Sequence, residues 1–280
     1  MAEAPQQFSV NDVVSEALVF TRTQSRFIAM TTAIGVAALI TALLLQLALG
    51  PLAGVLAFVV QAVVYTAFLC VALGQAPGAV RSGLVAASAR VFAALGVVVS
   101  FLFFVLFVAM IPGVTVLGMV ALGPFEEQLA AAATDQTATM TILTQAMETN
   151  PLPFLLFFLA YVALWLLLTS RLYLAAPASA ERGRILSFET WRWTKGAMLH
   201  IAGARLMLLA PAYVLVMAVA VLMARLVGIG DVFAAGTTAP NVPALVLYLA
   251  VLNALNLGLY LSLEAGLSAA IYRRLAPPAA

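Results

Sequence analysis

Histidine, cysteine and lysine are almost missing from the sequence, which holds one of each. The single cysteine, Cys70, excludes an intramolecular disulfide, and the single histidine, His200, excludes a metal site built from several histidines. The motifs HExxH, GxSxG and CxxC and the phosphate-binding loop are missing as well. We therefore expect a protein that is not an enzyme and that holds no cofactor.

Charged residues are also scarce, at 9% of the 280 residues, whereas 65% are hydrophobic. Soluble domains hold about 25% charged and about 45–50% apolar residues. Runs of about 20 apolar residues can cross a bilayer as helices. Six such runs occur, at 27–49, 52–73, about 91–120, 151–170, about 206–226 and about 244–270. The sequence thus predicts an all-α integral membrane protein with six transmembrane helices.

The basic residues are distributed very unevenly between the two sides that six spans define. Twelve of the 13, Arg205 among them, fall on the side of the termini, and only Arg225 falls on the other. Positively charged loops stay in the cytoplasm, so both termini are expected there. Abundant Ala, Val and Gly with Arg in place of Lys favour a GC-rich bacterium, and hence its inner membrane. Because topology explains the positive charge, no nucleic-acid partner is expected.

Short charged segments precede the odd-numbered spans in a regular rhythm. SEALVFTR (15–22) aligns with FETWRWTK (188–195), and the region 81–90 occupies the same place before the third span. The rhythm predicts three repeats of an interfacial amphipathic helix followed by a transmembrane hairpin. The repeats cover about 1–79, 80–183 and 184–280 of a single membrane domain, 1–280.

The stretch from Leu186 to Met198 carries Trp191, Arg192, Trp193 and Lys195. One stripe of the helix expected here consists of Leu186, Thr190, Trp193 and Ala197. Tryptophan prefers the headgroup level and basic side chains reach anionic lipid, so we expect an interfacial helix on the cytoplasmic leaflet. Such a helix orients the following hairpin as a structural foot, or docks a partner or a specific lipid.

Ionisable and amide side chains inside the predicted spans mark a candidate intramembrane polar site. Glu264 and Arg171 lie at similar depths, so we expect either an intramembrane ion pair or separate snorkelling to the cytoplasmic interface. Gln61, Asn253 and Asn256 add hydrogen-bonding groups in the second and sixth spans. Such amides bridge helices or, where they converge, line a polar pathway.

The longest loop, 123–153, is acidic and is expected to face away from the cytoplasm. Its Ala and Leu content allows one or two short helices. The loop forms a cap over the bundle or a site for a partner.

Three segments carry a resemblance: FSVNDVVSEALVFTR (8–22), RLYLAAPASA (171–180) and ETWRWTKGAM (189–198). Together they resemble bacterial six-span inner-membrane proteins related to the membrane domain of glycerophosphoryl diester phosphodiesterases. In those enzymes catalysis belongs to a separate soluble domain. The resemblance therefore implies an accessory membrane domain with no catalytic residue to carry over.

Taken together, these features favour an accessory or scaffold protein that organises lipid or partner proteins. The expected partners are membrane lipids, anionic ones included, and a membrane protein or a second copy of the chain. The alternative is a transporter or channel for a lipid or small solute, with a polar pathway near Glu264, Arg171, Asn253 and Asn256.

Overall fold

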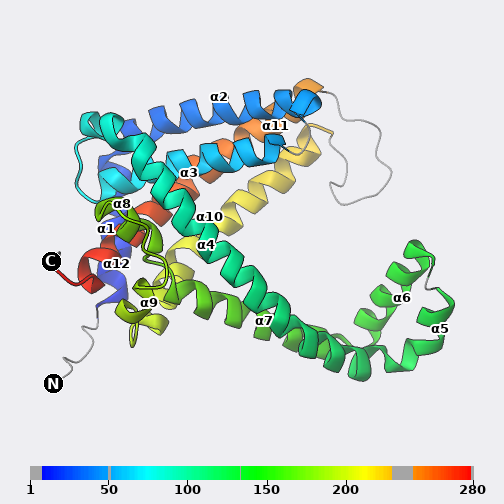
Figure 1. The fold of residues 1–280 in the computed structure, drawn as a ribbon. Helices are drawn as coiled ribbons and strands as arrows, with labels where there is room; N and C mark the ends of the chain where they lie inside the picture. Colours follow the sequence, from blue (N-terminus) through cyan, green and yellow to red (C-terminus); the bar gives the residue numbers. More distant parts are fainter. Residues whose placement is uncertain (1–7, 50–51, 133, 229–241, 279–280) are drawn as a thin grey trace, which may run out of the picture. The chain divides into compact units, whose positions relative to one another are not determined.

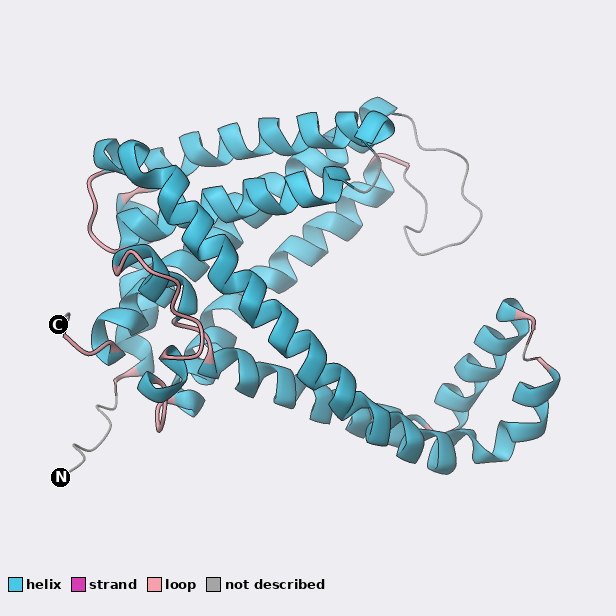
Figure 2. Ribbon diagram, in the orientation of Figure 1, coloured by secondary structure: helices cyan, strands magenta, loops and turns pink. Residues whose placement is uncertain are grey.

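The computed structural model describes residues 8–49, 52–132, 134–228 and 242–278. Helices form all the regular structure of these residues, and no strand occurs among them (Figure 1, Figure 2). The all-helical fold class is therefore confirmed.

Six helical segments of the described chain are long and apolar enough to cross a membrane by length and composition. They are α2 (Ser25–Leu49), α3 (Leu52–Ala72), α4 (Pro77–Leu117), α7 (Pro151–Arg171), α10 (Met198–Leu226) and a last segment. The last consists of α11 (Val242–Leu255), the π-helix η3 (Asn256–Leu261) and α12 (Ser262–Leu275). The six predicted spans are confirmed as helices, and the chain is a multi-pass membrane protein on this ground.

The chain divides into two compact units, one of residues 1–97 with 170–280 and one of residues 98–169. In the first unit α12 packs against both α1 (Val10–Thr23) and α3. The apolar face of α1 is buried at Val13, Val14 and Ala17. A Cβ added to Gly266 of α12 would lie 3.2 Å from the Cα of Ala17, so the two helices touch through small residues.

The hairpin of α2 and α3 packs on the π-helix in the same way. A Cβ at Gly35 would lie 2.8 Å from a methyl of Val64 and 2.9 Å from one of Leu257. A Cβ at Gly258 would lie 3.3 Å from the side chain of Thr32. Small residues thus allow α2, α3 and η3 to approach one another closely.

Two expected interfacial helices differ from the prediction. The region 81–90 lies inside α4, which begins at Pro77 and continues through Pro112. Proline suits the first turn of a helix, and no strong breaker follows before Pro112. The separate short helix predicted there is therefore wrong, and the three-repeat arrangement stays a prediction.

The tryptophan-bearing stretch is also less helical than expected. Only α9 (Thr190–Trp193) is helical, between turns on both sides, and Gly196 has a φ of 89°. The hydroxyl of Thr194 donates to the Arg171 carbonyl at 2.9 Å, which holds the turns to the end of α7. The prediction of a continuous interfacial helix was therefore wrong. Three of the four residues of the predicted stripe are nevertheless buried: Leu186, Thr190 and Ala197.

The second unit contains the later part of α4, most of α7 and four short helices between them. These are η1 (Gly118–Leu122), η2 (Gly123–Phe125), α5 (Glu126–Ala131) and α6 (Gln136–Thr149). The carboxylate of Asp135 accepts hydrogen bonds from the amides of Thr137 and Ala138 and so caps α6. The prediction of short helices in the loop 123–153 is confirmed.

Side chains on the long helices of the second unit are apolar and exposed. Phe103 and Phe104 of α4 are 72% and 66% exposed. The two long helices themselves touch, because a Cβ at Gly113 of α4 would lie 2.6 Å from the Phe157 ring of α7. Large aromatic side chains turned outwards over a long helix are typical of a surface that faces lipid.

Candidate functional site

A group of polar side chains lies inside the first unit, and we call it the buried polar cluster: Tyr65, Tyr173, Arg205, Tyr260 and Glu264. They come from α3, the chain before α8 (Ala175–Glu181), α10, η3 and α12. Tyr65, Tyr173 and Arg205 are at most 9% exposed, whereas Tyr260 and Glu264 are partly exposed. Charges and hydroxyls of all five interact electrostatically, so the cluster is one polar network inside apolar helices.

Arg205 is the positive centre of this cluster. Its guanidinium lies 4.9 Å from the ring centre of Tyr173 and donates from Nη1 to the hydroxyl of Ser170 at 3.4 Å. The sequence placed Arg205 just before the fifth span, and this was wrong, because α10 begins at Met198 and carries Arg205 into the bundle. The pattern of one arginine surrounded by apolar residues was the available signal.

Glu264 interacts electrostatically with this arginine and not with the predicted partner. Arg205 and the hydroxyl of Tyr260 are the groups that stabilise its carboxylate. The ion pairs between described residues do not include one of Glu264 with Arg171. Arg171 instead lies with its guanidinium 5.3 Å from the ring centre of Trp191. The predicted pair was wrong, because similar depth in the bilayer does not place two side chains on facing sides of their helices.

The hydroxyls of Tyr65 and Ser268 lie 3.2 Å apart and link α3 to α12 beside the cluster. Tyr260 belongs to η3, a π-helical turn that adds a residue to the turn and so shifts the side chains after it around the axis. Such π-helical turns are frequent at functional sites. Asn256, another predicted site residue, is the first residue of this turn.

Two other predicted site residues lie together elsewhere. Gln61 and Asn253 line a pocket of about 160 Å³ with apolar residues of α2, α3 and α11. The amide of Asn253 donates to the Leu249 carbonyl of its own helix at 2.8 Å. The five predicted residues therefore do not form one site: Gln61 and Asn253 share a pocket, whereas Glu264 belongs to the buried polar cluster.

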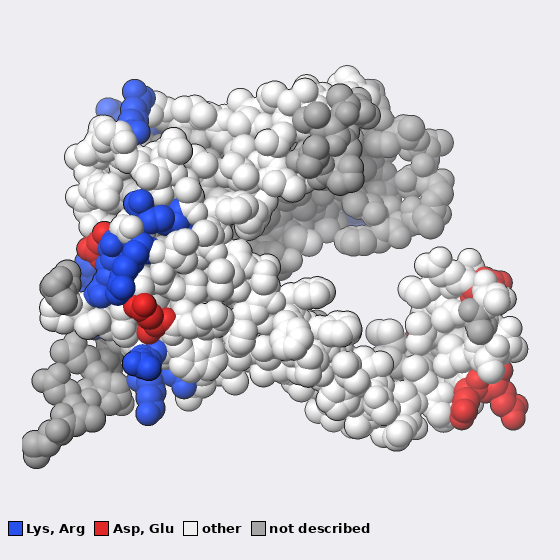
Figure 3. All heavy atoms as spheres, in the orientation of Figure 1, with Lys and Arg blue, Asp and Glu red and all other residues white. Residues whose placement is uncertain are grey.

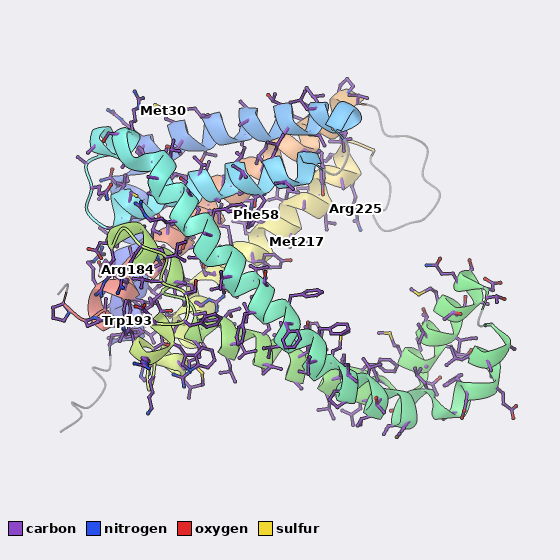
Figure 4. The ribbon with its side chains drawn as sticks, viewed as in Figure 1. Met30, Phe58, Arg184, Trp193, Met217 and Arg225 are labelled. Atoms are coloured by element: carbon purple, nitrogen blue, oxygen red, sulfur yellow. The ribbon has the colours of Figure 1, made fainter. Side chains whose placement is uncertain are left out.

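One end of the first unit is charged, and the start of α1 and the end of α12 lie there (Figure 1). Lys and Arg gather there on the face shown in Figure 3. Figure 4 places Arg184 and Trp193 at this end and Arg225 at the opposite end of the unit. We call it the charged end, and its arrangement follows the predicted separation of the basic residues.

Glu16 of α1 joins the two arginines of the last helix at the charged end. Its carboxylate accepts hydrogen bonds from Arg274, at 2.7 Å, and from Arg273. Partial burial by itself raises the pKa of this carboxyl, but the hydrogen bonds and charges of the two arginines outweigh burial and lower the pKa. Arg273 also donates to the carbonyl of Ala72 at 2.6 Å, so it closes the end of α3.

Aromatic rings cover other arginines of the charged end. The Arg182 guanidinium lies 4.6 Å from the ring centre of Trp193 and donates from Nε to the Tyr272 hydroxyl at 3.1 Å. Arg192 and Lys195, predicted to be interfacial, are both exposed. This combination of tryptophans with exposed basic side chains is typical of a membrane interface.

An apolar groove of about 530 Å³ runs along α2, α3 and the start of α4. Met30, Ile34 and Val63 are among its lining residues, and Arg81 is its one charged residue. Met30 is visible on α2 in Figure 4.

Among the described residues no three His, Cys, Asp or Glu side chains are grouped so that they could hold a metal ion. No protein-family model, no curated protein and no solved structure matches the chain. The resemblance to the phosphodiesterase membrane domain therefore stays a prediction.

Proposed function

We propose that the chain is a non-enzymatic inner-membrane protein that organises lipid or partner proteins, with both termini in the cytoplasm. The observation that carries this proposal is the burial of three members of the buried polar cluster. Arg205, Tyr65 and Tyr173 are buried, and other residues line the two pockets described above. Polar side chains that interact with one another inside a bundle hold helices together.

The charged end supports the lipid part of this proposal. Arginines beside Trp191 and Trp193 fit the headgroup level of the cytoplasmic leaflet. Anionic lipid headgroups attract these arginines, because each basic residue near the membrane surface contributes about 1 kcal/mol of binding free energy. The apolar groove with Arg81 at its lining offers a neighbouring surface for an acyl chain.

The pocket lined by Gln61 and Asn253 is the one feature that favours the alternative, a transporter or channel. Its volume of about 160 Å³ is small. Neither Glu264 nor Arg171 lines it, so the residues expected along a polar pathway do not converge there.

Native mass spectrometry of the protein extracted with its surrounding lipid tests the proposal. We expect a defined lipid, or a defined protein in fixed stoichiometry, to stay bound after the detergent is removed in the instrument. A bare chain under conditions that preserve other membrane complexes would contradict the proposal.

A further inference from the structure

A third pocket, of about 520 Å³, opens at the charged end between the chain after α8 and the end of α12. We call it the arginine pocket, and its lining residues are Glu181, Arg182, Arg184, Tyr272, Arg273, Ala276 and Pro277. The lining holds three arginines and one glutamate, and Arg273 is already paired with Glu16 of α1. Arg182 and Arg184 are therefore the two arginines that a ligand would engage.

The protein holds Arg182 in place at this pocket. Its guanidinium donates to the hydroxyl of Tyr272 and to the carbonyl of Pro277 and lies against the Trp193 ring. A neutral hydroxyl, a carbonyl and a ring orient the guanidinium without neutralising it. Arg182 takes part in none of the ion pairs between described residues.

The neighbouring arginine comes from the turn that ends α8. Gly183 has a φ of 68°, a conformation that suits glycine, and it lies between Arg182 and Arg184, which both line the pocket. Arg184 pairs with Glu189 at 3.2 Å, but both side chains are more than half exposed. Such an exposed pair is weak, so an incoming anion can compete for Arg184.

The geometry points to binding of a phosphate group in the arginine pocket. The planar guanidinium matches the oxygens of a phosphate with two parallel hydrogen bonds. Because Trp193 lies beside Arg182, the pocket sits where the headgroup of a phospholipid would lie. The inference rests on the proposed function, and it names the recognised chemistry: the phosphate of an anionic phospholipid headgroup or of a soluble phosphate compound.

Binding is measured on the full chain in non-ionic detergent, with intrinsic tryptophan fluorescence as the readout because the Trp193 ring lies against Arg182. One titration uses mixed micelles with phosphatidylglycerol, and another uses inorganic phosphate at constant ionic strength. Saturation by the lipid micelles alone assigns a lipid headgroup, whereas equal saturation by inorganic phosphate assigns a soluble phosphate compound.

Arg182→Gln and Arg184→Gln should each weaken binding at least about tenfold, because each removes a charge-assisted hydrogen bond. Arg184 is exposed, so its variant folds normally even where Arg182→Gln does not. Arg225→Gln, at the opposite end of the unit, is the matched control and should bind like the unchanged protein. Wild-type affinity in the Arg184→Gln protein, or no saturation by either probe, overturns the inference. If both arginine variants still retain lipid in native mass spectrometry, the phosphate site has failed but the proposed function has not.

Discussion

At the scale of residues, Arg205 decides how the interior of the first unit is organised. An arginine inside an apolar bundle is costly unless its charge is balanced and its donors are used. Tyr173 and Ser170 contact its guanidinium, and Glu264 supplies the opposing charge. The sequence shows that Glu264 needs a partner. The choice between Arg171 and Arg205 depends on how each helix is rotated about its own axis, and this cannot be read from a single sequence.

A double-mutant cycle tests this assignment. Arg205→Met and Glu264→Gln should each lower the thermal stability, and their effects should be coupled by about 0.5–3 kcal/mol because the groups interact. The matched control is the cycle of Arg171→Met with Glu264→Gln, whose effects should add. Thermal unfolding in detergent measures both cycles. Additive effects for Arg205, or coupling for Arg171, would reverse the assignment.

The Glu16 carboxyl predicts a pH dependence at the charged end. Since its pKa in the folded protein lies below the ordinary value of 4.5, its contribution is complete above that value. The contribution is lost as the pH falls through the lowered pKa. Glu16→Gln should therefore lower the stability at neutral pH and flatten the fall of stability in acid.

Thermal midpoints between neutral pH and the acid limb measure this difference. Glu189→Gln removes the carboxylate of the exposed pair with Arg184 and serves as the control, with little change expected at any pH. An acid limb of the same steepness in Glu16→Gln and in the unchanged protein speaks against the role given to Glu16.

At the scale of elements, hydropathy predicts where the spans are but not how their ends are built. Length and apolar composition were sufficient for α2, α3 and α7, because a bilayer leaves few other solutions. The stretch around α9 had helical periodicity, yet its hydroxyls bond to main-chain carbonyls and Gly196 takes a positive φ. The π-helical turn η3 has no sequence signal that we could read.

The contact of α1 with α12 predicts an unequal response to two glycine substitutions. Gly266→Ala should destabilise the protein by about 1–3 kcal/mol, because its methyl would press on Ala17 and Phe20. Gly203→Ala in α10 is the control, since nothing lies within 4 Å of its added Cβ. That substitution should be neutral or stabilise by up to about 1 kcal/mol through lower chain entropy.

Thermal unfolding and limited proteolysis in the α1 region report on both glycine variants. Faster cleavage near α1 is expected for Gly266→Ala alone. Equal behaviour of the two variants would argue against close packing of α1 on α12.

At the scale of the whole molecule, the sequence predicted the all-helical class and all six apolar helices. It did not predict the division into two compact units, since that depends on contacts between segments far apart in the chain. Nor did it predict that Gln61 and Asn253 line one pocket, whereas Glu264 lies near Arg205 and Tyr260. The arginine pocket was also missed, although RGR (182–184) supplied two of its arginines.

The distribution of basic residues predicts the sidedness of the protein. In a Cys70→Ala background, Ser82→Cys should react with a membrane-impermeant maleimide only in inside-out vesicles. Thr141→Cys on α6 should react only from the other side, because the acidic loop 123–153 is expected there. Labelling of both positions from one side would show that the assumed topology is wrong.

The most direct measurement of the central claim is the water accessibility of the buried polar cluster. In the same cysteine-free background, Ser170→Cys beside Arg205 and Ser268→Cys beside Tyr65 place thiols at two edges of the cluster. Both serines are 0% exposed, so we expect no reaction with a water-soluble thiol reagent from either side, while Ser82→Cys reacts fully. Reaction of either buried thiol, in a variant with unchanged thermal stability, would reveal a water-filled path and contradict the closed cluster on which the proposed function rests.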